Sequence, residues 1–181
     1  MPYDGLVIAT GVRPRRLPGG GGHQLRTLDD ALALRERLRP GRRLMVVGAG
    51  FLGAEAAAVA RKLGCDVTLL EPAPVPLVQA VGNEVGQVLA DVHRDRGVNL
   101  RTGVTVTEVT EGGVRLAGGE TVEGDEVLVA VGSSPNTDWL AARTGPLNRL
   151  SELVHAGQKR QPLGLGQVRQ PLNTRIVREE N

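Results

Sequence analysis

A glycine-rich segment at residues 48–53, GAGFLG, combines residue types and spacing that point directly to chemistry. In the pattern GxGxxG, the first glycine (Gly48) permits a tight turn and the second (Gly50) lets a pyrophosphate approach the backbone. The third, Gly53, lets a following helix pack closely on a strand. The N–H groups of Phe51, Leu52 and Gly53 would lie at the positive end of that helix, where they can bind a diphosphate. The segment therefore predicts a dinucleotide site.

An acidic residue stands where such a site needs one. Glu71 follows Gly48 by 23 residues and closes an apolar run at 66–70. A carboxylate there can accept both ribose hydroxyls of an adenosine and would repel a 2′-phosphate. No Arg or Lys lies between Glu71 and Arg94 to offset that repulsion. We predict binding of NADH in preference to NADPH. A Rossmann-like scaffold that binds no nucleotide is the alternative.

The elements that must position these residues alternate between strand and helix patterns. Apolar runs predict buried strands at 5–11, 43–47, 66–70 and 126–132. Helical spacing predicts helices capped by Thr27 and ending before Pro40, at 54–63, and at 83–96. Short β-prone pieces between 98 and 122, separated by glycine pairs, predict hairpins, and residues 12–24 predict a loop or linker. The expected fold is α/β, a Rossmann-like parallel sheet with a small antiparallel β-meander.

Composition excludes several function classes. A single cysteine, Cys65, excludes a disulfide framework and a cysteine-rich metal site, and the three histidines lack metal-ligand spacing. Cys65, His23 and His93 are therefore interpreted as a buried hydrophobe and two surface residues. Three aromatic residues are too few for stacking on single-stranded nucleic acid. No run approaches the ~20 apolar residues of a membrane span, and no signal-peptide layout is present, so a cytoplasmic location is expected.

The last part of the chain has a different character. Residues 141–181 hold seven basic and three acidic residues and little sustained periodicity, apart from a possible short helix near 148–155. We predict an irregular or disordered basic tail. Binding of nucleic acid by this tail is disfavoured, and a strong salt dependence lost on deleting 141–181 would reveal it.

Three motifs in order support a family resemblance. The segment GAGFLGAE at 48–55 resembles the NADH-binding motif of ferredoxin reductase-type FAD/NAD(P)-dependent oxidoreductases, in the pyridine nucleotide-disulfide oxidoreductase superfamily. ATG at 9–11 with Pro14 is similar to the segment by which such chains leave the FAD domain. VGSSPN at 131–136 is similar to the segment by which they return. The likeness covers residues 3–140 and implies the FAD/NAD(P)-binding fold.

The resemblance also implies roles for individual residues. Glu55 would lie near the nicotinamide and hold its carboxamide, and Gly132 would approach the cofactor through its backbone. A surface glutamate and a plain strand-ending glycine are the alternatives. The implied activity passes electrons from NADH through FAD to a ferredoxin-type iron–sulfur protein. No residue is a candidate proton donor or nucleophile, so no catalytic residue is predicted.

The sequence departs from the family pattern in its FAD motifs. An FAD-binding GxGxxG is absent, and the only Gly-Asp pair, Gly124-Asp125, precedes the VGxxPN segment instead of following it. We therefore expect residues 1–26 to be a strand plus linker of an FAD domain and 27–140 to be the NAD-binding domain. FAD is not expected to bind this chain, and the chain alone is expected to be inactive. A stand-alone, non-catalytic NAD-binding module is the second hypothesis. A short-chain dehydrogenase is excluded because Tyr3, the only tyrosine, lacks the Tyr-xxx-Lys pattern.

Overall fold

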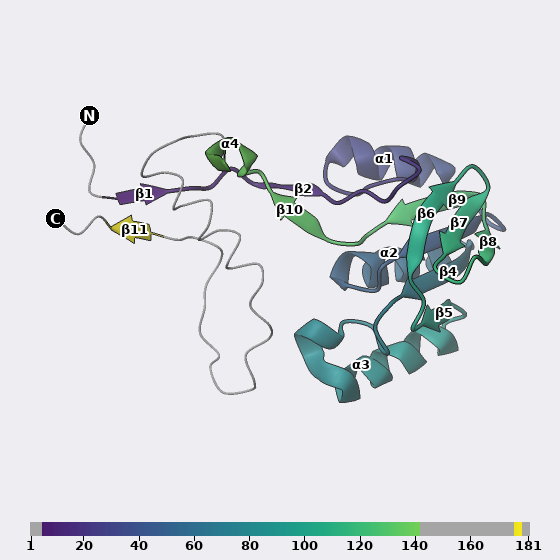
Figure 1. Ribbon diagram of the computed structural model, residues 1–181. Helices are drawn as coiled ribbons and strands as arrows, with labels where there is room; N and C mark the ends of the chain where they lie inside the picture. Colours follow the sequence, from purple (N-terminus) through teal and green to yellow (C-terminus); the bar gives the residue numbers. More distant parts are fainter. Residues whose placement is uncertain (1–4, 142–175, 179–181) are drawn as a thin grey trace. The chain divides into compact units, whose positions relative to one another are not determined.

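The computed structural model describes residues 5–141 and 176–178 (Figure 1). It separates the chain into two units, residues 14–134 and a second unit formed by 1–13 with 135–181. The chain passes from one unit to the other in two short paired strands, β2 (Val12–Pro14) and β10 (Ser133–Pro135). The glycine-rich segment and Glu71 both belong to the unit of residues 14–134.

A four-stranded parallel sheet forms the centre of that unit. Its order is β5-β4-β3-β9, with β3 at Arg43–Val47, β4 at Asp66–Glu71, β5 at Asn99–Thr102 and β9 at Glu126–Val129. Val47, the last residue of β3, pairs with Leu70 on one side and Val129 on the other. The carboxyl ends of these three strands therefore meet at one edge, and the predicted parallel sheet is confirmed.

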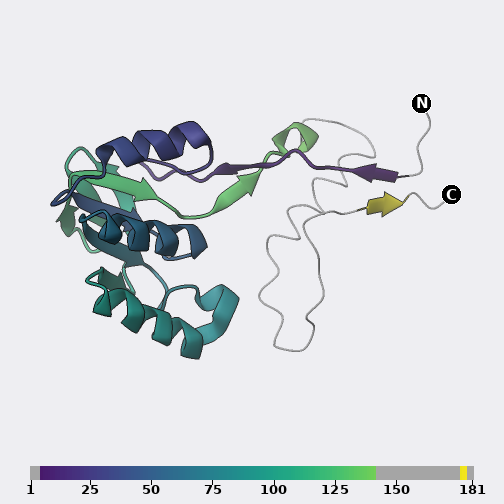
Figure 2. The same cartoon turned by 180° about the vertical axis from the view of Figure 1, so that it is seen from behind.

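Three helices cover one face of this sheet: α1 (Leu28–Arg37), α2 (Phe51–Lys62) and α3 (Val78–Asp95) (Figures 1 and 2). Leu44 and Val46 of β3 point into the core that these helices share. Helix α2 contributes Ala57 and Ala60, both fully buried. Because alanine side chains are short, the backbone of α2 lies close to the sheet, which brings its first residues to the strand ends.

The opposite face of the sheet is covered by the predicted antiparallel meander. Strands β6 (Val106–Thr110), β7 (Gly113–Leu116) and β8 (Thr121–Glu123) pair in sequence order. Met45 and Val47 of β3 point to this side and pack with the buried Val114. Alternate residues of β3 thus enter two different cores, which explains why the strand is a continuous apolar run.

Local chemistry sets the ends of the helices, and two of the helices begin at a different residue from the one predicted from the sequence. Thr27 caps α1 as predicted, because its hydroxyl accepts the Asp30 N–H while the Asp30 carboxylate accepts the Thr27 N–H. Helix α2 starts at Phe51 and not at 54, since glycine does not prevent helical geometry at its first turn. Helix α3 starts at Val78 and not at 83, and it contains a break at Gly82, whose φ of 78° is left-handed.

The second unit and the strand that leads out of it correct two expectations. The predicted buried strand at 5–11 is shorter, β1 (Gly5–Val7), and Val7 is 50% exposed. Residues 12–24, predicted as a loop, contain β2. Within the predicted irregular tail, the described residues form one short strand, β11 (Ile176–Arg178), which pairs antiparallel with β1. Apolar periodicity reports neither what covers a strand nor which distant segment pairs with it. Helix α4 (Asp138–Ala141) follows β10, and the rest of the tail, including the possible helix at 148–155, lies outside the described residues.

His23 is also placed differently from the surface position expected. Its N–H donates to the carbonyl of Val127 at 2.7 Å, and its carbonyl accepts the N–H of Val129 at 2.9 Å. Nε2 lies 2.8 Å from the carboxylate of Glu126, and the side chain is 25% exposed. The linker therefore adds a single parallel β-bridge to the edge of β9, a contact that local sequence does not encode.

Candidate dinucleotide-binding site

The glycine turn connects β3 to α2 at the carboxyl edge of the sheet. Gly48 has a φ of +100°, a conformation that side chains rarely adopt, and a Cβ there would lie 2.6 Å from the carbonyl oxygen of Ala130. Its N–H donates to the carbonyl of Leu70 at 2.8 Å. Position 48 thus requires glycine for both conformation and space, as the sequence indicates.

The other two glycines of the turn differ in what surrounds them. A Cβ at Gly53 would collide with the carbonyl oxygen of Gly48, because α2 begins against the turn that precedes it. At Gly50, which is exposed, a Cβ would meet no atom within 4 Å. Packing among the described residues therefore explains why position 53 requires glycine, but it does not explain the glycine at position 50. The open space at Gly50 leaves room for a bound group to approach the backbone closely.

The N-terminus of α2 provides donors beside this space. Gly50 is the N-cap residue, and no side chain of the described residues caps the helix there. Phe51 and Leu52, the next two residues, have exposed fractions of 63% and 42%. An accessible helix start with uncapped N–H groups carries partial positive charge and suits an anionic ligand. The residues present therefore fit a pyrophosphate.

Glu71 lies beside the turn and is held by backbone donors. One carboxylate oxygen accepts the N–H of Ala49 at 2.6 Å, and the other accepts the N–H of Ala73 at 2.9 Å. The side chain is half-buried. Each oxygen keeps a second lone pair for a further donor such as a hydroxyl. The structure therefore brings Glu71 to the glycine turn, as a site for the adenosine ribose requires.

Two further residues, Glu55 and Gly132, have predicted roles toward the cofactor. Glu55 is exposed on the second turn of α2. Gly132 has a φ of +88°, and its carbonyl accepts the N–H of Arg15 at 3.0 Å. It lies two residues after Ala130, the residue whose carbonyl borders Gly48. Both residues are in the same unit as the turn. Their predicted contacts with a nicotinamide and with a cofactor stay predictions.

Sequence reasoning missed three residues that hold the turn. Ala49 is fully buried, and it is bonded through both its N–H and its carbonyl. Ala73 donates to Glu71, and Leu77 donates its N–H to the Ala49 carbonyl at 3.1 Å. The prolines at 72, 74 and 76 indicate a rigid connection, but no sequence signal shows where its N–H groups point.

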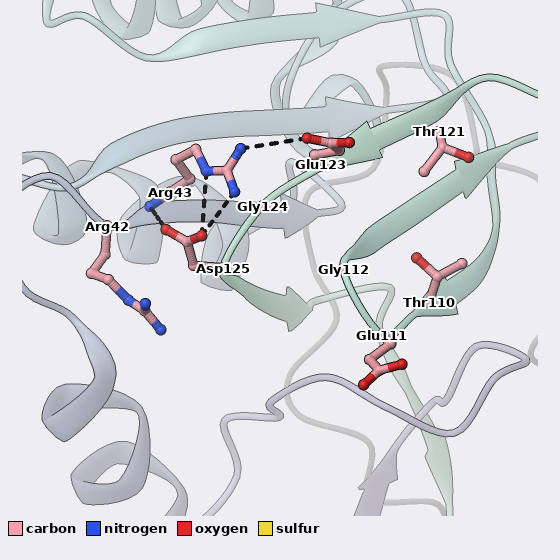
Figure 3. A pocket seen from close by; sticks show the side chains of 9 residues that line it. All are labelled: Arg42, Arg43, Thr110, Glu111, Gly112, Thr121, Glu123, Gly124 and Asp125. Carbon is pink, nitrogen blue, oxygen red and sulfur yellow. Dashed lines mark hydrogen bonds and ion pairs between the residues drawn. The ribbon is translucent and has the colours of Figure 1, made fainter.

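A hollow of about 550 Å³ lies at the other end of β3. Figure 3 shows Arg43, the first residue of β3, between Asp125 and Glu123. The Arg43 guanidinium lies 2.9 Å from Asp125 and 3.8 Å from Glu123. Hydrogen bonding from Arg43 lowers the pKa of Asp125 from its ordinary value of 3.8 to about 2. The hollow lies at the amino ends of the strands, away from the turn.

The remaining titratable groups of note are structural. Burial raises the pKa of the Cys65 thiol, which donates to the carbonyl of Arg39, and burial lowers the pKa of His93. Within residues 5–141 and 176–178, no three His, Cys, Asp or Glu side chains gather as metal ligands. In the same residues, no helix has the length and apolar character needed to cross a membrane.

The parallel sheet, the glycine turn at its carboxyl edge and the antiparallel meander together define a Rossmann-like domain of the FAD/NAD(P)-binding class. A profile of the pyridine nucleotide-disulphide oxidoreductases matches residues 1–154. The chain belongs to the pyridine nucleotide-disulphide oxidoreductase family, and the predicted superfamily and fold class are confirmed.

Several known proteins similar to this chain are reductases. The ferredoxin–NAD(+) reductase component of a p-cumate 2,3-dioxygenase system from Pseudomonas putida is 45% identical over 144 residues, 76% of this chain and 36% of that protein. A ferredoxin reductase structure from Rhodopseudomonas palustris is 36% identical with a TM-score of 0.70, over 79% of this chain and 39% of that one. A covalent putidaredoxin reductase–putidaredoxin complex matches at 35% identity and a TM-score of 0.69, over 77% and 37%. The chain thus spans a little over a third of these relatives.

Proposed function

We propose that this chain is the NADH-binding part of an FAD-dependent oxidoreductase of the ferredoxin reductase type. The observation that carries the proposal is the open position at Gly50, beside the uncapped start of α2 and near the carboxylate of Glu71. The turn and the N–H groups of Phe51, Leu52 and Gly53 would hold the pyrophosphate. Glu71 would accept the ribose hydroxyls and disfavour a 2′-phosphate.

The electron path is proposed by similarity. A relative of this chain is a ferredoxin–NAD(+) reductase component, and a matching structure contains a reductase joined to putidaredoxin. Bound NADH would supply a hydride to FAD, which passes single electrons to a ferredoxin-type iron–sulfur protein. The residues of this chain would bind and orient the nucleotide, with Glu55 near the nicotinamide and Gly132 close to the cofactor. A cytoplasmic location is part of the proposal.

Calorimetric titration of the purified chain with NADH and with NADPH tests the binding claim. We expect NADH to bind more tightly, and Glu71→Arg to shrink or reverse the difference because it replaces repulsion of a 2′-phosphate by attraction. Gly50→Val serves as the control that removes binding of both nucleotides. Equal affinities in the wild type, or tighter NADPH, would contradict the proposed role of Glu71.

A stand-alone NAD-binding module is the second candidate, because the described residues form one complete glycine turn without a second. The DNA on both sides of the reading frame separates the two. A GxGxxG motif encoded upstream, or a Gly-Asp motif downstream, favours the reductase, and the lack of both favours the module. FAD is proposed not to bind these 181 residues, so the purified chain should show no flavin absorption.

A further inference from the structure

The loop after β4, residues 72–77, contacts the glycine turn at Ala49. The Ala49 N–H donates to Glu71, and the Ala49 carbonyl accepts the N–H of Leu77 at 3.1 Å. Ala49 itself has no exposed surface. The N–H and the carbonyl of Ala49 are therefore both held by residues that lie more than twenty positions later in the chain.

Leu77 makes its contact in an unusual conformation. Its φ of 55° and ψ of 16° are left-handed, and among the described residues it is the only non-glycine residue with a positive φ. Its carbonyl accepts the N–H groups of Ala80 and Val81, which starts α3. A leucine is held in this region only when surrounding contacts require it. Here the left-handed turn directs the N–H toward Ala49 while the carbonyl begins the helix.

The loop is fixed from its other side as well. A Cβ at Gly86 of α3 would lie 2.5 Å from the Val75 side chain and 2.8 Å from the Pro76 carbonyl, so α3 lies directly against the loop. The Ala73 N–H holds the second oxygen of Glu71 at 2.9 Å. Residues 72–77 therefore contact α3 on one side and the glycine turn on the other.

We propose that Leu77 is a positioning residue for nucleotide binding, which fixes the peptide group between Ala49 and Gly50 and thereby the orientation of the turn. This inference rests on the proposed function. Leu77 has no predicted contact with the nucleotide. It raises affinity by removing freedom from the turn before the ligand arrives, so that less conformational entropy is lost on binding.

Two substitutions at one position separate conformation from packing. Leu77→Val introduces a β-branched side chain that strongly disfavours the left-handed region, whereas Leu77→Asn accepts it. Both remove the leucine side chain. We expect the dissociation constant for NADH to rise about tenfold in Leu77→Val, the equivalent of one lost hydrogen bond. Leu77→Asn should stay within about threefold of the wild type, on the same scale.

Wild-type affinity in a folded Leu77→Val would overturn the proposal, and so would an equal loss in both variants, which would show that packing alone matters. Amide hydrogen exchange in the ligand-free chain provides a readout that needs no nucleotide. Exchange at Leu77 in the wild type should be slow, and at position 77 it should accelerate about tenfold in Leu77→Val but not in Leu77→Asn. If the wild type fails to bind NADH, the proposed function fails, while these exchange rates still decide whether Leu77 holds the turn.

Discussion

Thr10 and Asn136 join two distant motifs by reciprocal hydrogen bonds. The Thr10 hydroxyl donates to the Asn136 carbonyl at 2.7 Å, and the Asn136 side-chain amide donates to the Thr10 carbonyl at 3.2 Å. The Asn136 N–H donates to the carbonyl of Gly11 at 3.0 Å. The ATG and VGxxPN segments, recognised separately in the sequence, thus hold each other where the chain leaves and re-enters the unit of residues 14–134.

Asn136→Ala should loosen this junction. The substitution removes the amide donor to Thr10, and we expect the opening free energy at the residue 136 N–H to fall by about 1 kcal/mol. Amide exchange followed by NMR measures it. Asp138→Ala removes only the ion pair with Arg13, whose two side chains are 48% and 72% exposed, and should change the same value by less than about 0.5 kcal/mol. Equal effects of the two substitutions would refute the assignment.

Alanine at the second and third glycines of the turn should have opposite consequences. Gly53→Ala forces a Cβ into the Gly48 carbonyl, so we expect a loss of about 1–3 kcal/mol in the free energy of unfolding. Gly50→Ala meets open space and should change stability by less than about 1 kcal/mol. Urea denaturation measures both. A Gly50→Ala variant as unstable as Gly53→Ala would show that position 50 is packed after all.

Thr27→Ala should destabilise the start of α1. The substitution removes the hydroxyl that accepts the Asp30 N–H, and the loss of an N-cap typically costs about 1 kcal/mol. Urea denaturation of Thr27→Ala is compared with that of Asp29→Ala, which removes an acidic side chain from the same turn. The comparison separates the loss of the capping hydrogen bond from the loss of a favourable charge at the helix dipole. No difference between the two variants would contradict a specific capping role.

Asp125 should make the fold sensitive to acid. Its pKa is lowered to about 2 in the folded chain, so an unfolded chain takes up its proton first as the pH falls. The stabilisation is therefore complete above about pH 4 and is lost as the pH falls toward 2. Asp125→Asn should have a smaller loss of stability over this range, measured by urea midpoints at several pH values. An unchanged slope would show that the Arg43–Asp125 pair does not contribute.

The strands and helices around the glycine turn could be predicted from the sequence because their signals are local. The apolar run at 43–47, the GxGxxG spacing and the N-cap at Thr27 each involve residues within a few positions of one another. Gly48 and Gly53 could be assigned for the same reason, since the tight turn and the close helix both belong to one short segment. The order of these elements was enough to define the fold class.

Only the tertiary structure decided which distant groups meet. The bridge of His23 to β9, the bonds between Thr10 and Asn136, and the carboxylate of Glu71 on the Ala49 N–H all join residues 22 to 126 positions apart. The left-handed Leu77 has no signal in its residue type, which disfavours that conformation. Such contacts depend on backbone groups brought together by the packed sheet and helices. Side-chain periodicity along the chain records which face a residue occupies, but not which donor will lie opposite it.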